Sequence, residues 1–187
     1  MIDRTSLRLS ATLLLVGQLL YIVVSQFHPD REAANNHPAV FTEYAGSGIW
    51  TAVHLGQFAG MAILLAGLLA LFFALDLQAG TARWMGRFGA ASVVAALALY
   101  GALQAVDGVA NKQVDAAWVS APDTEKAARF ASAEAIRWIE WGMRSYHDFA
   151  LGLALLLVAA EVMRTAGIPR PIAYLMELSG LTYLVQG

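Results

Sequence analysis

The sequence contains no cysteine, and charged residues make up only 14% of its 187 positions. The absence of cysteine excludes disulfides, iron–sulfur clusters, thiolate metal sites and cysteine nucleophiles, so any metal ion would depend on histidine and carboxylate ligands. The formal net charge of -2 provides no basic surface for nucleic acid, and no glycine-rich phosphate loop follows a strand pattern. We therefore expect no nucleic-acid partner.

Hydrophobic residues are abundant instead, at 58% of the chain with a mean hydropathy of +0.56. This exceeds what a water-exposed surface tolerates, so the lipid bilayer is the expected solvent. A hydrocarbon core of about 30 Å needs roughly 20 apolar residues in a helix. We predict an all-α, polytopic membrane helical bundle that forms a single unit over residues 1–187. Its predicted spans are residues 7–27, 49–75, 88–109 and 144–163, with a partial fifth over 172–187 that leaves open a continuation of the natural protein beyond Gly187.

Arginine is distributed unequally between the two sides of the predicted bundle. If the spans alternate, one side carries Arg4, Arg8, Arg83, Arg87, Arg164 and Arg170. The short opposite loop over residues 28–48 carries only Arg31. Because positive residues in short flanks resist translocation, this pattern predicts a cytoplasmic N-terminus. The first apolar run is too long for a signal peptide, so we expect it to be retained.

The two connections on the opposite side differ in character. Residues 28–48 are rich in proline, asparagine and glycine and should be mostly irregular, which makes His28 and His37 ordinary surface residues. The longer connection over residues 110–141 shows helical spacing from Asp123 onward. It predicts an outer amphipathic helix over 123–141, with a bend at Gly142 before the fourth span.

Polar residues gather near this same side on every predicted span. They share helical spacing within each span: His54 and Gln57; Tyr100, Gln104 and Asp107; Glu140, Arg144 and His147, followed by Asp148. Each set lies on one helix face, and a central Asp or Arg facing lipid costs about 2.5–3.5 kcal/mol. We therefore expect these faces to turn inward around a hydrated pocket that opens to the outside. Glycines should let the helices pack closely around its apolar floor: Gly56, Gly60, Gly67, Gly101 and Gly152.

The first functional interpretation is a site for a divalent metal or a small ligand. His54, Asp107 and His147 are the candidate metal ligands, with Glu140 as a possible fourth, because imidazole and carboxylate at one depth suit Zn²⁺ or a similar ion. The remaining candidates would hold the ligand or surround the metal with hydrogen bonds: Gln57, Tyr100, Gln104, Arg144 and Asp148.

A second interpretation is electron transfer through a b-type haem, with His54 and His147 as axial ligands. These two positions resemble one half of the four-helix core of the cytochrome b561 class, although the second histidine pair of that class is lacking. A third interpretation is a non-enzymatic sensor or interaction subunit, with homo-oligomerisation left open. A transporter is less favoured, because the other half of every span is uninterrupted apolar sequence.

Purely structural roles account for some of the same residues. Asp107 lies near a predicted helix end, where water could solvate it, and His54 could simply hydrogen-bond to Gln104 or Asp107. Arg144 has an acidic residue four positions away on either side, Glu140 and Asp148, so local ion pairs are expected along the helix.

The segment LSGLTYLVQG, with a histidine in the second span and a long outer connection before the fourth, resembles bacterial polytopic membrane proteins grouped as a domain of unknown function. The resemblance implies a location in the bacterial inner membrane and implies no known activity.

Overall fold

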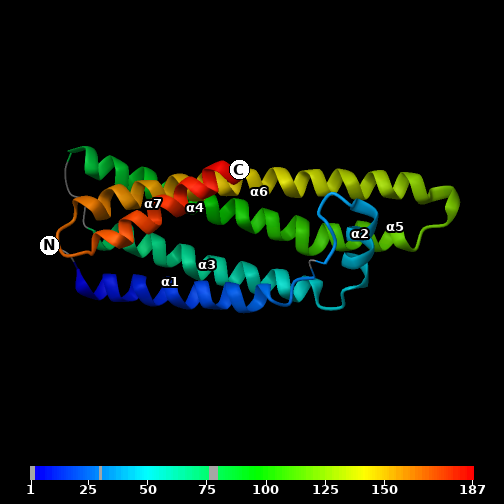
Figure 1. The fold of residues 1–187 in the computed structure, drawn as a ribbon, viewed down its shortest axis with the longest axis horizontal. Coiled ribbons are helices and arrows are strands. Elements are labelled where there is room, and N and C mark those ends of the chain that lie inside the picture. The colour runs from blue at the N-terminus through cyan, green and yellow to red at the C-terminus, as the bar shows by residue number, and fades with distance from the viewer. Residues whose placement is uncertain (1–2, 30, 76–79) are drawn as a thin grey trace.

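The computed structural model describes residues 3–29, 31–75 and 80–187, and within these residues all regular structure is helical. In chain order the helices are α1 (Arg4–Ser25), α2 (His37–Gly46), α3 (Trp50–Ala74), α4 (Gly80–Ala105), the π-helix η1 (Val106–Asn111), α5 (Lys112–Val119), α6 (Asp123–Arg164) and α7 (Arg170–Gln186). Figure 1 shows the long helices side by side, with α2, α5 and the first half of α6 gathered at one end. We call this the polar end; the N-terminus and the α6–α7 connection lie at the opposite end.

Four helical segments of the described chain are long and apolar enough to cross a membrane: Arg4–Ser25, Trp50–Ala74, Gly80–Val119 and Asp123–Arg164. The predicted spans over 88–109 and 144–163 lie inside the last two segments, and those over 7–27 and 49–75 extend beyond the first two by no more than two residues at either end. The predicted helical bundle is therefore confirmed. The side chains of α1 that face away from the bundle are apolar and exposed, including Leu19, Ile22 and Val23. This surface is compatible with a multi-pass membrane protein whose helices are solvated by lipid.

The predicted connection over residues 110–141 is not a loop, because helical structure continues beyond the third span through η1 and α5. The predicted helix over 123–141 and the predicted fourth span are one helix, α6, which has 42 residues and is therefore about 63 Å long. The predicted bend at Gly142 is wrong. One glycine weakens a helix by no more than about 1 kcal/mol, and both halves of α6 are held by packing, the first on α5 and the second on α4 and α7.

The first outer connection is also more ordered than predicted, since it contains α2. Pro38 occupies the first turn of α2, where its missing N–H costs nothing. Phe41 and Tyr44 of α2 are buried in a small core with Trp50 of α3. The Lys112 ammonium donates to the carbonyl oxygens of Tyr44, Ala45 and Ser47 at 2.9, 2.7 and 2.8 Å. The Lys112 side chain thus provides hydrogen-bond donors for the carbonyl groups at the C-terminal end of α2, and it holds α2 in place over the polar end.

Helix α7 runs back along α6 and has 17 residues, or about 25 Å. It is shorter than a hydrocarbon core of about 30 Å, in keeping with the predicted partial fifth segment. Helices α6 and α7 contact each other closely at Gly152 of α6 and Gly180 of α7. If residue 152 had a side chain, its Cβ atom would lie only 2.8 Å from the Gly180 carbonyl oxygen. Gly60 brings α3 equally close to the backbone of Tyr21 in α1. Gly101 was predicted to play the same part but has only an ordinary contact with a side chain.

These contacts predict opposite effects for alanine at two glycines of α6. Gly152→Ala should lower the free energy of unfolding by about 1–3 kcal/mol, because its methyl group meets backbone that cannot move aside. Gly142→Ala should leave it unchanged or raise it by up to about 1 kcal/mol, because no atom lies within 4 Å of the new carbon. Reversible unfolding in detergent micelles measures both values. Equal effects of the two substitutions would contradict the packing described for α6 and α7.

Candidate functional site

The polar end is organised by the π-helical turn η1, which interrupts the long helical run from Gly80 to Val119. Turns of this kind are rare and often occur at functional sites. Two backbone carbonyls of η1 accept hydrogen bonds from α3. The Trp50 indole donates to the Asp107 carbonyl and the Thr51 hydroxyl to the Gly108 carbonyl, both at 2.8 Å. These bonds fix the register between the second and third spans.

Gly108 allows α3 and η1 to approach each other closely. A Cβ at this position would lie 2.5 Å from Cβ of His54, a distance that side chains do not adopt. The close approach places His54 Nε2 3.1 Å from Oδ2 of Asp107. Asp107 is only 6% exposed, so the interpretation of this residue as a solvated helix end is wrong.

The hydrogen bonds of His54 define the state of its second nitrogen. Nδ1 lies 2.8 Å from the Trp50 carbonyl oxygen, and because a carbonyl only accepts, Nδ1 carries the proton. In the neutral ring Nε2 therefore presents a lone pair. Although Asp107 is near, the geometry does not make a hydrogen bond, and within the described residues buried Nε2 has no hydrogen-bond partner. The predicted contact between His54 and Asp107 is present. In the neutral form of the His54 ring, the lone pair of Nε2 faces the carboxylate.

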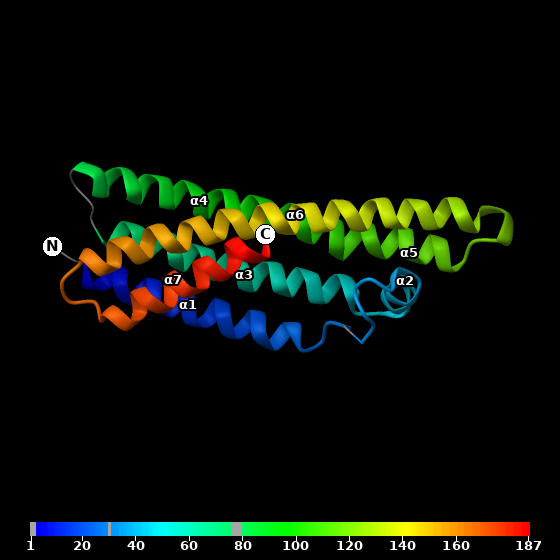
Figure 2. The same cartoon turned by 45° about the horizontal axis from the view of Figure 1, so that its top comes forward.

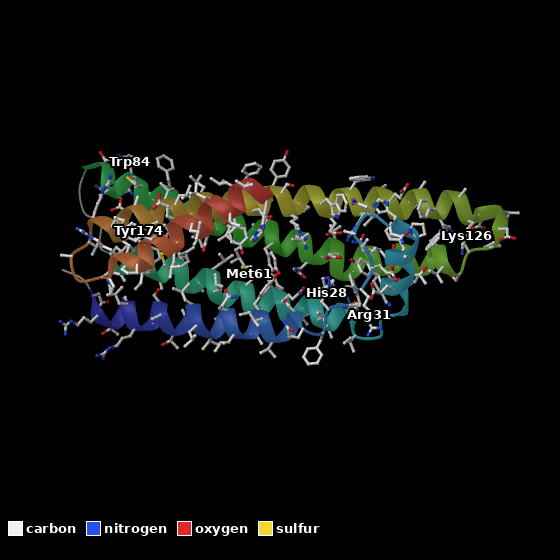
Figure 3. The ribbon with its side chains drawn as sticks, in the orientation of Figure 1. His28, Arg31, Met61, Trp84, Lys126 and Tyr174 are labelled. Carbon is white, nitrogen blue, oxygen red and sulfur yellow. The ribbon has the colours of Figure 1, made fainter. Side chains whose placement is uncertain are left out.

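His28 completes a group with these two residues. Single ligand atoms of His28, His54 and Asp107 all lie within 4.8 Å of one another. The His28 ring packs 5.1 Å from the His54 ring and 4.9 Å from the Trp50 ring, and Figure 3 shows His28 at the polar end, beyond Met61. The prediction that His28 and His37 are ordinary surface residues is wrong: His37 lies 2.9 Å from Glu134 and stacks on Phe41.

His147, predicted as the third metal ligand, lies outside this group. Its Nδ1 is 2.9 Å from the Ala96 carbonyl oxygen, and its ring packs 4.9 Å from the ring of Tyr100. As in His54, the carbonyl contact places the proton on Nδ1 and leaves Nε2 as an acceptor. His147 therefore belongs to the wall of a cavity rather than to the group around His54.

Glu140, predicted as a possible fourth metal ligand, is held by other partners. It is 1% exposed, and its carboxylate accepts from the Arg137 guanidinium and, at 3.2 Å, from the Asn111 amide. The same amide donates to Asp107 at 3.2 Å. The expected ion pairs of Arg144 with Glu140 and Asp148 are not formed, and within residues 3–29, 31–75 and 80–187 Arg144 has no ion pair.

A cavity of about 630 Å³ extends from His28 to Met61 inside the polar half of the bundle. Seven of the nine predicted site residues line it: Gln57, Tyr100, Gln104, Asp107, Arg144, His147 and Asp148. The Tyr100 hydroxyl and the Gln104 side-chain carbonyl are buried and have no hydrogen-bond partner in the described part of the chain. Gln57 donates to the Ser25 hydroxyl at 3.2 Å. The inward orientation expected for the polar faces is thus observed.

Sequence reasoning missed several polar residues beneath α2. Asn111 and Asp115 are buried and follow Asp107 at intervals of four residues, a helical spacing that could have identified them. Arg137 is also buried, with its guanidinium 5.5 Å from the centre of the Tyr44 ring. Burial raises the pKa of the Tyr44 phenol to about 12, so this hydroxyl stays neutral beside the acidic residues.

No protein-family model, no curated protein and no solved structure matches this chain.

The hydrogen bond between Trp50 and the Asp107 carbonyl can be tested by Trp50→Phe. This change keeps an aromatic ring but leaves a buried carbonyl without its donor, at a cost of about 1–3 kcal/mol. We expect a matching loss in unfolding free energy and faster amide hydrogen exchange in residues 106–111. Trp138→Phe, at an exposed position, is the control and should change neither. Unaltered exchange in η1 of the Trp50→Phe protein would mean that this bond does not hold the turn.

Proposed function

We propose that this protein binds a divalent transition-metal ion, best represented by Zn²⁺, through His28, His54 and Asp107. The observation that carries the proposal is the buried lone pair of His54 Nε2, which faces a carboxylate and a second imidazole within 4.8 Å. A cation placed among them would remove the unfavourable approach of two acceptors. Two imidazoles and one carboxylate are ligands that Zn²⁺ binds in proteins.

The spacing of the ligand atoms supports this assignment. Ligands about 2.0–2.1 Å from a tetrahedral Zn²⁺ stand about 3.3 Å apart, so closing a group spread over at most 4.8 Å takes modest side-chain rotation. Three protein ligands leave a fourth position for water or a bound molecule. His28 and Asp107 line the cavity, so that position would face into it.

The surroundings of the ligands also suit a metal. The Trp50 carbonyl holds the Nδ1–H of His54, and the Asn111 amide holds the second oxygen of Asp107. Hydrogen bonds of this kind orient metal ligands and fix the imidazole tautomer.

A b-type haem between His54 and His147 remains the alternative. In its favour, both rings have Nδ1 against a backbone carbonyl, which leaves Nε2 to bind iron. Against it, the Tyr100 ring packs on His147 and Asp107 lies beside Nε2 of His54.

We further propose the inner membrane of a bacterium as the location, with a cytoplasmic N-terminus. Support comes from the arginine pattern of the sequence and from the four apolar helices. The polar end would then face the periplasm. The resemblance to bacterial proteins of a domain of unknown function stays a prediction.

Metal content tests the proposed site. Protein purified, stripped with a chelator and titrated with ZnCl₂ should bind one ion per chain by elemental analysis and calorimetry. His54→Ala should abolish this binding and His28→Ala should weaken it strongly, because each change removes one of the three protein ligands. His147→Ala is the matched control and should retain it. Loss of binding in His147→Ala together with full binding in His28→Ala would contradict the ligand set.

An absorption spectrum separates the metal proposal from haem. We expect a protein without a Soret band, because the proposed ligands suit Zn²⁺, which has no visible absorption. A Soret band in protein expressed with added haem, lost in both His54→Ala and His147→Ala, would replace the metal proposal with the haem alternative.

Acidification should release the metal. Protons compete with the metal for imidazole nitrogen and carboxylate oxygen, so Zn²⁺ affinity should fall steadily as the pH is lowered from 7 towards 5. Equilibrium dialysis at several pH values measures this dependence. An affinity that does not change over this range would argue against histidine ligands.

A further inference from the structure

A largely apolar groove lies beside the polar cavity. It has a volume of about 810 Å³ and is lined by residues of α1, α3, α6 and α7, mostly apolar ones such as Leu15, Leu155 and Leu175, with Gln18 and Ser179 among them. Helix α1 packs along α3 and α7 along α6, and Figure 2 shows α7 lying between α1 and α6 in that view. The groove therefore runs along a seam between two helix pairs.

Groove and cavity share part of their lining. Tyr21, Met61 and Tyr183 line both, so these three side chains form the boundary between the two spaces. A molecule lying across this junction would have one end among polar groups and the other among leucines. We infer that the protein binds a single-chain amphiphile, with its hydrocarbon tail in the groove and an uncharged head that carries hydroxyl and carbonyl groups in the cavity.

The head chemistry follows from the hydrogen-bonding groups of the cavity. The Tyr100 hydroxyl lies near the side chains of Tyr21 and Gln104, but in the described part of the chain neither it nor the Gln104 carbonyl makes a hydrogen bond of good geometry, and a buried polar group without a partner is costly. Tyr100 would donate to a carbonyl oxygen of the head. Gln104 can only accept through its oxygen, so it would receive a hydroxyl proton. Nε2 of His147 offers a second acceptor.

The charges of the cavity favour a head without net charge. Arg144 and Asp148 both line the cavity and carry opposite charges, and the Asp107 carboxylate already accepts a hydrogen bond from the Asn111 amide at 3.2 Å. Neither sign therefore dominates the space where the head would lie.

The length of the groove suits one acyl chain. On α1 its lining runs from Ala11 to Tyr21, which is about 15 Å along a helix axis. Half of a hydrocarbon core of about 30 Å has the same depth. A tail of this length in the groove would lie across the middle of α1 and could enter sideways from the bilayer.

This inference goes beyond the proposed metal site and does not depend on it. None of the three proposed metal ligands lines the groove. A metal at His28, His54 and Asp107 would face the head of the amphiphile across the cavity.

Photo-crosslinking tests the inference. The full chain would be reconstituted in phosphatidylcholine nanodiscs with a monoacylglycerol that carries a diazirine midway along its acyl chain, and labelled residues would be mapped by mass spectrometry. We expect labelling concentrated on the groove residues of α1 and α7 and displaced by excess monooleoylglycerol. Labelling spread evenly over exposed apolar residues, including Val94 of α4, would show annular lipid only and overturn the inference.

Helix α7 offers a matched pair of variants for the tail. Leu175 and Leu178 are 65% and 64% exposed, but only Leu175 lines the groove. Leu175→Trp should fill the groove and reduce labelling roughly tenfold, a change of about 1.4 kcal/mol in binding. Leu178→Trp should leave labelling unchanged. Equal labelling of both variants would overturn the inference.

Two further variants test the head and separate this inference from the metal proposal. Tyr100→Phe removes only a hydroxyl and should weaken displacement by monooleoylglycerol while leaving displacement by hexadecane unchanged. If displacement by monooleoylglycerol is unaffected, the head does not occupy the cavity and the inference fails. His54→Ala should keep the labelling although it loses Zn²⁺, so failure of one proposal is distinguishable from failure of the other. Thermal unfolding of each variant confirms that it is folded.

Discussion

The contact between α3 and the π-helical turn η1 is the constraint on which the polar end depends. Two side chains of α3, Trp50 and Thr51, bond to consecutive carbonyls of η1, and Gly108 leaves room for His54 against the turn. The same contact sets the distance between His54 and Asp107. A regular α-helix continued from α4 would rotate Asp107 and Asn111 relative to α3, and the three-residue group around His54 would not form.

Polar groups in a lipid-solvated bundle must find partners inside it, and this requirement explains how α6 is used. Its first half lies beyond the other long helices at the polar end (Figure 1) and contributes Arg137 and Glu140 to a buried network with Asn111 and Asp107. Its second half packs on α4 and α7 through small and apolar residues. One continuous helix thus supports the polar end and the apolar half together.

The cavity and the groove follow from the way α1 and α7 pack. Each runs along one partner, α3 or α6, through glycines that allow close backbone contact. Close packing within each pair leaves a seam between the pairs, which is apolar along the hydrocarbon and polar near His28 and Arg144. This polarity gradient matches the amphiphile proposed above, which would enter from the bilayer with its head towards the polar end.

Hydropathy and helical spacing alone determined the all-helical bundle, the four long apolar helices and the inward orientation of Gln57, Tyr100, Gln104 and Asp107, because lipid penalises every exposed polar face regardless of tertiary detail. The sequence also placed His54 beside Asp107. Only the tertiary structure decided that His28 joins them and His147 does not, since α2 and the packing of His28 on Trp50 depend on contacts between distant segments. The tertiary structure also decided that α6 continues without a bend at Gly142. Packing of α6 on neighbouring helices outweighs the weak tendency of a single glycine to interrupt a helix.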